Sequence, residues 1–459
     1  MTTKQQKKQL SLPFPTAGRG EAPVAVGKGT EAVKAGCGSE SPASPECLME
    51  EVCQRDNLVK ALKRVKANRG SPGIDGMKVE ELSEYLKEHW PQTREQLLQG
   101  TYQPQPVKRV YIPKPVGGER PLGIPTVLDR FIQQAVLQVL QRSWDRTFSE
   151  HSYGFRPGRS AHQAVARAQE YIAQGYGYVV DMDLEKFFDR VNHDILMGLV
   201  AKRVKDKRML KLLRAYLSAG VMETGLVSSV TEGTPQGGPL SPLLSNLLLD
   251  VLDKELEKRG HRFVRYADDC NIYVRSKRAG ERVMANVSRF LEKKLRLKVN
   301  QVKSAVARPG ERKFLGFSFT LGKTPKRRIA PQSLKRLKLK VKELTRSRRN
   351  LNLSNLVDRL RLYLIGWRGY FGFCETPSVL SKLDSWIRRR LRMILWRQWK
   401  RGRTRFAELR QRGVGHDLAA KTAGSAHGPW RLSRSPTLSF ALPNSYFTSL
   451  DLPSLAPGR

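Results

Sequence analysis

The sequence predicts an α+β protein, and two stretches of the chain lead to that prediction. The first is 262–274, where β-branched and aromatic residues flank the adjacent acids Asp268 and Asp269. Strand-forming residues on either side of a short polar break are typical of a β-hairpin. The second is the stretch that begins near residue 331, where apolar residues recur at helical spacing in three successive segments.

Asp268 and Asp269 put two negative charges at the tip of the predicted hairpin. Adjacent carboxylates repel each other unless a cation binds between them. Hard oxygen ligands select Mg²⁺, which usually takes one or two protein carboxylates and leaves room for substrate phosphates. A bare Asp-Asp pair is more often a solvated turn, so the metal-binding interpretation depends on the rest of the chain.

The chain is strongly basic. Its 459 residues carry a formal net charge of +41, which indicates a polyanionic partner and most simply a nucleic acid. A membrane surface also attracts cations, but no apolar run is long enough to span a bilayer, so no membrane partner is expected. The five cysteines form no Cys-x-x-Cys pair, which argues against a zinc ribbon and fits a reducing, cytoplasmic compartment.

The first half of the chain begins with residues 1–43, which are rich in Ser, Pro, Gly, Ala and Lys and are expected to be disordered. They contain no apolar segment typical of a secretory signal. Order is expected from Ser44-Pro45, an N-cap followed by proline. Residues 107–124 predict a hairpin that brings Lys114 and Arg120 together, where two cations could clamp a triphosphate. An ordinary basic hairpin is the alternative.

A helix is predicted at 126–142, and the basic loop 152–160 follows it with Arg156 and Arg159 as candidate nucleic-acid contacts. The run 178–182 reads as a buried strand, and Asp183 falls where that strand ends and a helix is expected to start. A carboxylate at this point could share a metal ion with the hairpin pair. Asp181 has the same strand parity and remains a rival, whereas Asp189 is expected to face solvent or to cap a helix.

The segment 231–242 is rich in Gly and Pro, and its glycines let the backbone approach a substrate closely. Gln236 lies between them, and a leucine-rich helix follows. Further helix and strand patterns are found at 281–295 and 314–319.

The three basic helices after residue 331 each have one apolar stripe, so they can pack as a bundle. Few acids balance their cations, which favours a surface that follows a phosphate backbone over a merely solvated face. The candidate contacts in the third helix are Arg388, Arg389, Arg390, Arg392, Arg397 and Lys400. Residues 413–459 contain Gly, Ser, Pro and a few aromatics, and are expected to form a small, weakly ordered appendage.

Five motifs occur in a defined order: Asp183-Leu-x-x-Phe-Phe-Asp, Thr234-Pro-Gln-Gly-Gly, Tyr266-Ala-Asp-Asp, Lys303 and Phe314-Leu-Gly. In this order the chain resembles the reverse transcriptases, and most closely the bacterial group II intron-encoded reverse transcriptase/maturases. The resemblance implies a right-hand polymerase fold. It assigns fingers to 44–180, a palm with an antiparallel sheet and a helical insertion at 200–230 to 181–325, a three-helix thumb called domain X to 330–412, and a DNA-binding segment to 413–459.

The resemblance also implies roles for single residues. Asp183 and Asp268 would hold two Mg²⁺ ions, with the Leu184 carbonyl helping and Asp269 in support. Lys114 and Arg120 would clamp the triphosphate, and Phe188 would lie under the deoxyribose. Gln236 would line the nucleotide pocket and Lys303 would donate a proton to the leaving pyrophosphate.

The implied function is RNA-directed DNA synthesis together with binding of the intron RNA to assist splicing. The implied partners are the group II intron RNA, an RNA template with a DNA primer, a DNA target and dNTPs. Many members of the family end in an endonuclease with paired cysteines and histidines, and this sequence lacks that pattern, which suggests the class C lineage. The alternatives are a splicing-only RNA-binding maturase, another class of reverse transcriptase, and a domesticated, defence or repair enzyme.

Overall fold

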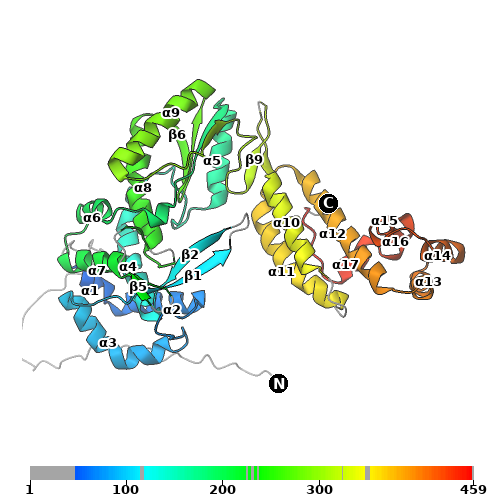
Figure 1. The fold of residues 1–459 in the computed structure, drawn as a ribbon, viewed down its shortest axis with the longest axis horizontal. Coiled ribbons are helices and arrows are strands. Elements are labelled where there is room, and N and C mark those ends of the chain that lie inside the picture. Colours follow the sequence, from blue (N-terminus) through cyan, green and yellow to red (C-terminus); the bar gives the residue numbers. More distant parts are fainter. Residues whose placement is uncertain are drawn as a thin grey trace, which may run out of the picture. The chain divides into compact units, whose positions relative to one another are not determined.

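The computed structural model describes residues 47–113, 118–223, 226–228, 232–234, 237–322, 324–346 and 352–456 (Figure 1). The chain divides into two compact units. Unit 1 consists of Met1–Ser160, Val180–Ile272 and Glu281–Ala305, and unit 2 consists of Ala161–Val179, Tyr273–Gly280 and Val306–Arg459. The predicted tail 1–43 and the predicted helix start at Ser44-Pro45 lie outside the described residues.

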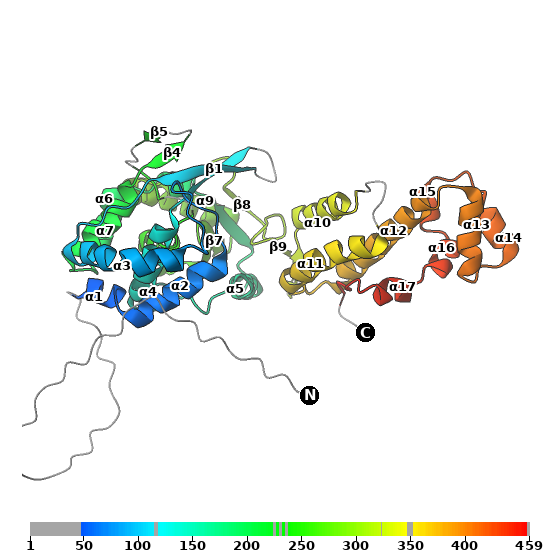
Figure 2. The same ribbon diagram turned by 90° about the horizontal axis from the view of Figure 1, so that it is seen from below.

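Helices make up most of the first unit. They are α1 (Leu48–Val52), α2 (Arg55–Asn68), α3 (Leu82–Gln99), α4 (Val127–Trp144), α6 (His193–Ala201), α7 (Lys207–Ser218) and α8 (Ser241–Lys258), with the 3-10 turns η1 (Asp145–Thr147) and η2 (Phe187–Asp189). Figure 2 shows α1 to α4 gathered on one side of unit 1 and β1, β4 and β5 on the other.

Helix α4 matches the helix predicted at 126–142. Its N-cap is Thr126, whose hydroxyl oxygen accepts a hydrogen bond from the Asp129 backbone N–H at 3.1 Å. The apolar face of α4, which includes Phe131 and Ala135, is fully buried, and α4 contacts α2 along its length. Capping and a buried stripe together explain why this segment is helical.

A four-stranded sheet with the order β2-β1-β4-β5 belongs to the same unit. The predicted hairpin is present as β1 (Val107–Pro113) and β2 (Glu119–Ile124), which pair antiparallel. The insertion at 200–230, predicted to be helical, contains α7 but also β4 (Val221–Glu223) and β5 (Leu226–Ser228). Strand β4 pairs parallel with β1, so the predicted helical insertion also contributes strands to this sheet.

The second four-stranded sheet has the order β6-β7-β3-β8. Its strands are β6 (Arg262–Tyr266), β7 (Asp269–Val274), β3 (Tyr178–Met182) and β8 (Ala305–Ala307). The predicted acidic hairpin is β6–β7, and the predicted buried strand is β3, which lies next to β7. Helix α9 (Lys277–Phe290) continues into the π-helical turn η3 (Leu291–Leu295). Helix α8 contacts β6, and its leucine-rich face is buried.

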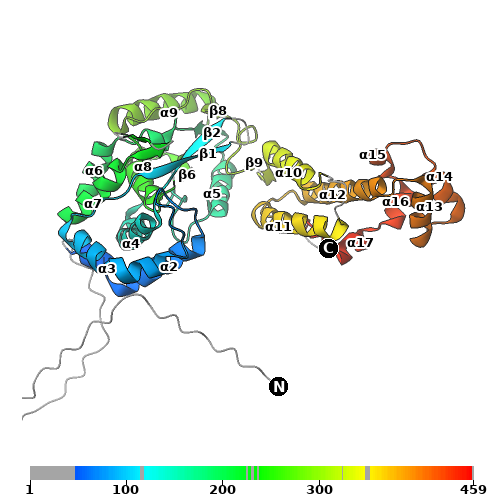
Figure 3. The same cartoon turned by 60° about the horizontal axis from the view of Figure 1, so that its bottom comes forward.

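The second unit contains α5 (Ala161–Ala173), the short antiparallel pair β9 (Phe317–Phe319) and β10 (Arg327–Ile329), and the predicted three-helix bundle. The bundle helices are α10 (Pro331–Leu344), α11 (Leu353–Phe371) and α12 (Pro377–Gln398). All three views show them side by side (Figures 1, 2 and 3). Leu337, Leu360 and Leu391, one from each predicted apolar stripe, are fully buried in one shared core.

The C-terminal segment is helical, and the prediction of a weakly ordered appendage is wrong. Helix α13 (Gly402–Gln411) precedes this segment, which contains α14 (His416–Ala423), α15 (Pro429–Leu432), α16 (Pro436–Ala441) and α17 (Asn444–Ser449). Leu438, Leu442 and Phe447 are fully buried in the same core as the bundle. The Ser and Pro content misled the prediction because these residues start helices here: Ser435 caps α16, and proline opens α15 and α16.

No helix in the described parts of the chain is long and apolar enough to cross a membrane.

Candidate active site

The acidic turn between β6 and β7 carries the two predicted carboxylates. Ala267 lies in the left-handed region with φ 58°, which turns the chain sharply between the strands. Asp268 is half-buried and Asp269, the first residue of β7, is exposed. The turn therefore presents Asp268 as the partly desolvated member of the pair.

Asp183 directly follows β3 and is fixed by the segment that precedes β8. Its backbone N–H donates to the Ser304 hydroxyl at 3.0 Å, and its carbonyl accepts from the Asn300 N–H at 2.8 Å. Leu184 forms an isolated bridge with Val299. The backbone on both sides of the Asp183 carboxylate is therefore held by a second strand-like segment.

The two carboxylates interact electrostatically. Burial, together with the negative charge of Asp183, raises the pKa of Asp268 above its ordinary value, while Arg120 and Arg265 oppose the rise. The Nζ of Lys303 lies 3.5 Å from Oδ2 of Asp183. The structure thus places Lys303 beside Asp183, and Asp183 and Arg120 both affect Asp268 electrostatically, while the catalytic roles of these residues remain predictions.

This set suits a hard divalent cation bound by few protein groups. Within the described residues no group of three or more His, Cys, Asp or Glu side chains could enclose a metal ion. Two carboxylates and a neighbouring carbonyl instead match the sparse ligation of Mg²⁺, which keeps several positions for water and substrate oxygens. The pKa of Asp268 is raised when no cation is present, and a bound cation would favour the ionised form of this carboxyl group.

The rival carboxylates, Asp181 and Asp189, differ from Asp183 in their surroundings. Asp189 is exposed in η2. Asp181 lies within β3, whereas Asp183 follows the strand and its negative charge adds to burial in raising the pKa of Asp268. The structure therefore favours Asp183, a choice that strand parity left open.

The chain after Asp183 is not the helix that the sequence predicted. Lys186 adopts φ 48°, and η2 follows as a single 3-10 turn. Phe187 is buried and Phe188 is half-buried, with their ring centroids 5.1 Å apart and nearly perpendicular. The left-handed residue reverses the chain, so Phe188 reaches its position through a turn and not through helical periodicity.

The loop at 232–234 is hydrogen-bonded to this turn. The Thr234 N–H donates to the Phe188 carbonyl at 2.7 Å. Gly233 has φ 96°, and a Cβ there would lie 2.9 Å from the Phe188 carbonyl oxygen. Nε2 of the buried His193 lies 2.6 Å from the Gly233 carbonyl oxygen. His193 was not predicted from the sequence because nothing in its local pattern distinguishes it from an ordinary helix-start residue.

Two predicted nucleotide-binding residues, Lys114 and Gln236, lie outside the described residues, so their roles remain predictions. Arg120 is on β2 opposite Ile112 and is exposed. Its positive charge partly opposes the rise in the pKa of Asp268 that burial and Asp183 cause.

Arg156 is buried, which corrects its prediction as a nucleic-acid contact. Its side chain is 4% exposed and pairs with Asp145 at 2.8 Å. It also donates to the carbonyls of Ser149, Ser152 and Asp145. With its donors occupied inside the protein, Arg156 organises the loop. Arg159 stays half-exposed over the Tyr153 ring and remains a candidate contact.

The arginines of α12 fall into two groups. Arg389 stacks on Trp430 at 4.0 Å and donates to its carbonyl, and Arg392 donates to the Leu442 carbonyl at 2.9 Å. Arg390 donates to the Thr345 hydroxyl and the Lys342 carbonyl at the end of α10. Arg390 therefore joins α12 to α10 within the bundle, and Arg389 and Arg392 join α12 to the C-terminal helices.

Arg397 and Lys400 are exposed, and Arg388 is half-exposed. Burial lowers the pKa of Arg390 and Arg392, and the positive charges of Arg397 and Arg388, respectively, add to the effect. Mutual repulsion among these cations is consistent with a surface that gains from a bound polyanion.

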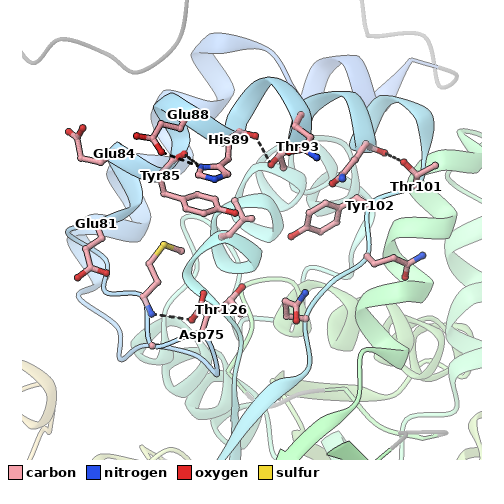
Figure 4. A pocket seen from close by; sticks show the side chains of 17 residues that line it. Asp75, Glu81, Glu84, Tyr85, Glu88, His89, Thr93, Thr101, Tyr102 and Thr126 are labelled. Carbon is pink, nitrogen blue, oxygen red and sulfur yellow. Dashed lines mark hydrogen bonds and ion pairs between the residues drawn. The ribbon is translucent and has the colours of Figure 1, made fainter.

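A cavity of about 1010 Å³ lies beside α3, and the acidic residues Asp183 and Asp268 are not among the residues that line it (Figure 4). Its rim carries Glu81, Glu84 and Glu88, and its floor is formed by Tyr85 and Tyr102. Acidic side chains repel phosphate, so this cavity is not suited to the nucleic-acid backbone.

Two protein-family models match the chain. Residues 112–319 match the model described as "Reverse transcriptase (RNA-dependent DNA polymerase)". Residues 334–413 match the model described as "Group II intron, maturase-specific domain". The first match contains the whole acidic site, and the second contains most of the three-helix bundle.

Individual proteins are similar over parts of the chain. Protein YkfC of Escherichia coli (strain K12) is 39% identical over 46% of this chain and 57% of its own length. Group II intron-encoded protein LtrA of Lactococcus lactis subsp. cremoris is 43% identical over 34% of this chain and 26% of its own. The matched segments thus span between a quarter and somewhat over half of these relatives. Among solved structures, telomerase from Candida albicans is 15% identical with a TM-score of 0.40, covering 68% of this chain and 64% of that chain.

Proposed function

We propose that this chain, which contains a reverse transcriptase domain followed by a group II intron maturase-specific domain and is homologous to group II intron-encoded proteins, is an RNA-directed DNA polymerase that also binds intron RNA to assist splicing. The observation that carries the proposal is the meeting of Asp183 with Asp268, with the cations Lys303 and Arg120 beside them. Few other chemistries need two partly desolvated carboxylates next to cationic side chains on so basic a chain.

In this proposal Asp183, Asp268 and the Leu184 carbonyl hold two Mg²⁺ ions. When bound, such ions activate a primer 3′-hydroxyl and stabilise the leaving oxygen in an in-line displacement. The protein's own part is to orient the reactants and to neutralise charge. Asp269 supports the turn from its exposed position.

Arg120 and Lys114 bind the triphosphate of the incoming dNTP. Lys303, whose side chain is 67% exposed, is long enough to follow the leaving pyrophosphate and to donate a proton to it. Phe188 packs under the deoxyribose, and Gln236 lines the nucleotide pocket. The hydrogen bond from Thr234 to Phe188 supports this arrangement, because it couples the loop that contains Gln236 to the sugar-binding turn.

Binding of the RNA template with its DNA primer, and of intron RNA, is assigned to the basic face of the thumb. Arg388, Arg397 and Lys400 have side chains accessible to phosphate, and Arg159 offers a further contact. A DNA target would be bound by the C-terminal helices. These substrates are found in the bacterial cytoplasm, which we propose as the compartment.

Primer extension on an RNA template tests the polymerase assignment. The wild-type chain should extend an annealed DNA primer with dNTPs when Mg²⁺ is present, and Asp268→Asn should not. A folded wild-type protein that extends no primer on RNA or DNA templates would contradict the assignment and favour a splicing-only RNA-binding protein.

A further inference from the structure

Arg265, on β6 two residues before the acidic turn, has a completely buried side chain. Its Nε and Nη2 donate to the two carboxylate oxygens of Asp253 at 2.7 and 2.6 Å. The remaining donors reach the Asn246 side-chain oxygen, the Ala267 carbonyl and the Ser152 hydroxyl. All five N–H groups of the guanidinium therefore have a partner inside the protein.

The pair with Asp253 on α8 is an ion pair in which both side chains are 0% exposed. Moving two charges out of water costs free energy that their attraction only partly returns, so an apolar pair of similar volume is often equally stable. Stability alone therefore gives little reason for a buried arginine at this position. Its remaining partners indicate another role.

The first of these partners is the carbonyl of Ala267, which Nη1 of Arg265 reaches at 2.8 Å. Ala267 has φ 58°, a left-handed conformation that is unfavourable for a residue with a Cβ. The next residue is Asp268. Arg265 thus holds the carbonyl of the strained residue that orients the candidate metal ligand.

The second group of partners belongs to the loop at residues 151–154, which packs against the turn. The Tyr153 N–H donates to the Arg265 carbonyl, and the Arg265 N–H donates to the His151 carbonyl, both at 2.9 Å. A Cβ on Gly154 would lie 2.2 Å from the Ala267 nitrogen, so this backbone lies directly against the turn. The Asn246 side chain donates to the Gly154 carbonyl at 2.9 Å and accepts from Arg265.

These contacts form a closed set around the turn. Arg265 connects a helix through Asp253 and Asn246, a loop through Ser152, and the turn itself through Ala267. The buried Arg156 donates to the Ser152 carbonyl at 2.9 Å and fixes that loop from the other side. A guanidinium can join these three elements because its donors diverge in a rigid plane, which an ammonium or an apolar side chain cannot reproduce.

We propose that Arg265 is a positioning residue for the polymerase reaction, one that holds the Ala267–Asp268 turn in the geometry that metal binding requires. The inference rests on the proposed function, since it assigns Asp268 its role as a ligand. Arg265 touches neither substrate nor the reacting atoms and acts only through the turn.

The test is the double variant Arg265→Met/Asp253→Leu, which removes both charges and keeps the volume of the pair. Its melting temperature should stay within a few degrees of the wild type. Its rate of single-nucleotide extension at saturating dNTP should fall about 100-fold, since a displacement of 1 Å at a reacting group has that effect. The Mg²⁺ concentration for half-maximal rate should rise, and the affinity for primer–template should not change.

A merely structural role predicts a different result, in which a double variant with wild-type stability extends primers at the wild-type rate. That result would overturn the proposal. If the double variant does not fold, Ser152→Ala decides, because it removes one acceptor and leaves the ion pair intact. Ser152→Ala should lower the extension rate about 10-fold and the melting temperature only slightly, because one buried guanidinium N–H loses its acceptor; an unchanged rate would overturn the proposal. Wild-type protein assayed in parallel separates these outcomes from a failure of the polymerase assignment, in which it too would be inactive.

Discussion

At the scale of single residues, the proposed chemistry depends on Asp268 and on the carboxylate it faces. Burial and the charge of Asp183 raise the pKa of Asp268, so the folded protein holds the Asp268 proton more tightly than the unfolded chain does. The ionised carboxylate lowers the free energy of unfolding, and this decrease is absent below the unfolded pKa of about 3.9. It grows as the pH rises from there and is complete above the folded pKa, so the site is destabilising at neutral pH when no cation is bound.

Asp268→Asn should therefore stabilise the metal-free protein at pH 7. The expected gain in the free energy of unfolding is on the order of 1 kcal/mol, because the substitution removes a desolvated charge and its repulsion by Asp183. Thermal unfolding of the wild type and of Asp268→Asn, each in EDTA and in Mg²⁺, measures this difference in stability. Mg²⁺ should raise the melting temperature of the wild type and not that of the variant, and the wild-type increase should shrink as the pH falls through the raised pKa. Equal Mg²⁺ responses from both proteins would argue against Asp268 as a ligand.

Phe188 should determine the choice between deoxyribose and ribose. Close-packed surroundings resist expansion, so an aromatic ring under the sugar leaves no room for a 2′-hydroxyl. Phe188→Val should raise ribonucleotide incorporation relative to deoxynucleotide incorporation by at least ~10-fold, which corresponds to a decrease in discrimination of about 1.4 kcal/mol. Single-nucleotide extension with matched dNTP and rNTP measures the ratio.

Phe187→Val is the matched control, because Phe187 is the buried neighbour and should affect stability more than discrimination. If Phe187→Val alters the ratio and Phe188→Val does not, the assignment is one residue off. If neither alters it, selection against ribose resides in other residues.

At the scale of elements, the loop that contains Gly154 packs with its backbone directly against the turn that contains Ala267. Gly154→Ala should force these backbones apart, because the new Cβ would lie 2.2 Å from the Ala267 nitrogen. We expect a fall in primer extension of about 100-fold together with a lower melting temperature. Gly198→Ala is the control, since Gly198 lies exposed on α6 with nothing within 4 Å of an added Cβ. Comparable activity of the two variants would contradict the close approach of the two backbones.

Helix α12 offers a second test, because its arginines differ in their partners. Arg397→Ala/Lys400→Ala removes two exposed cations and should reduce the slope of log K against log [salt] for nucleic-acid binding by roughly 0.7–0.9 for each phosphate that is no longer neutralised. Arg390→Ala removes a side chain that is bonded to α10, and should lower stability while changing the slope less. Binding titrations at several salt concentrations separate these results. A larger decrease in slope from Arg390→Ala would reverse the assignment.

The elements also show what the sequence could predict. The hairpin at 262–274, the strand before Asp183 and the three helices α10 to α12 were all predictable, because each has a clear apolar period and an identifiable end. The 3-10 turn at Phe188 was not, because its geometry depends on a left-handed Lys186, a conformation that local sequence rarely signals. The burial of Arg156 and Arg265 was likewise hidden, since a basic loop and a charged strand residue look solvent-exposed until their acceptors, distant in sequence, are placed around them.

At the scale of the whole molecule, the two proposed activities reside in different parts of the chain. The acidic site belongs to unit 1, whereas the basic helices α10, α11 and α12 belong to unit 2. A substitution of one carboxylate should therefore remove the chemistry without removing the surface that binds RNA. The central claim is this separation of DNA synthesis from intron RNA binding within one chain.

The most direct measurement compares Asp268→Asn with the wild type for primer extension and for affinity toward a folded group II intron RNA. We expect DNA synthesis by the variant to fall by at least ~100-fold, as when a group that stabilises the transition state is removed. Its affinity for the RNA should stay within about twofold of the wild type, because the binding surface is unchanged. A folded variant that binds RNA as poorly as it synthesises DNA, or one that retains synthesis, would contradict the separation.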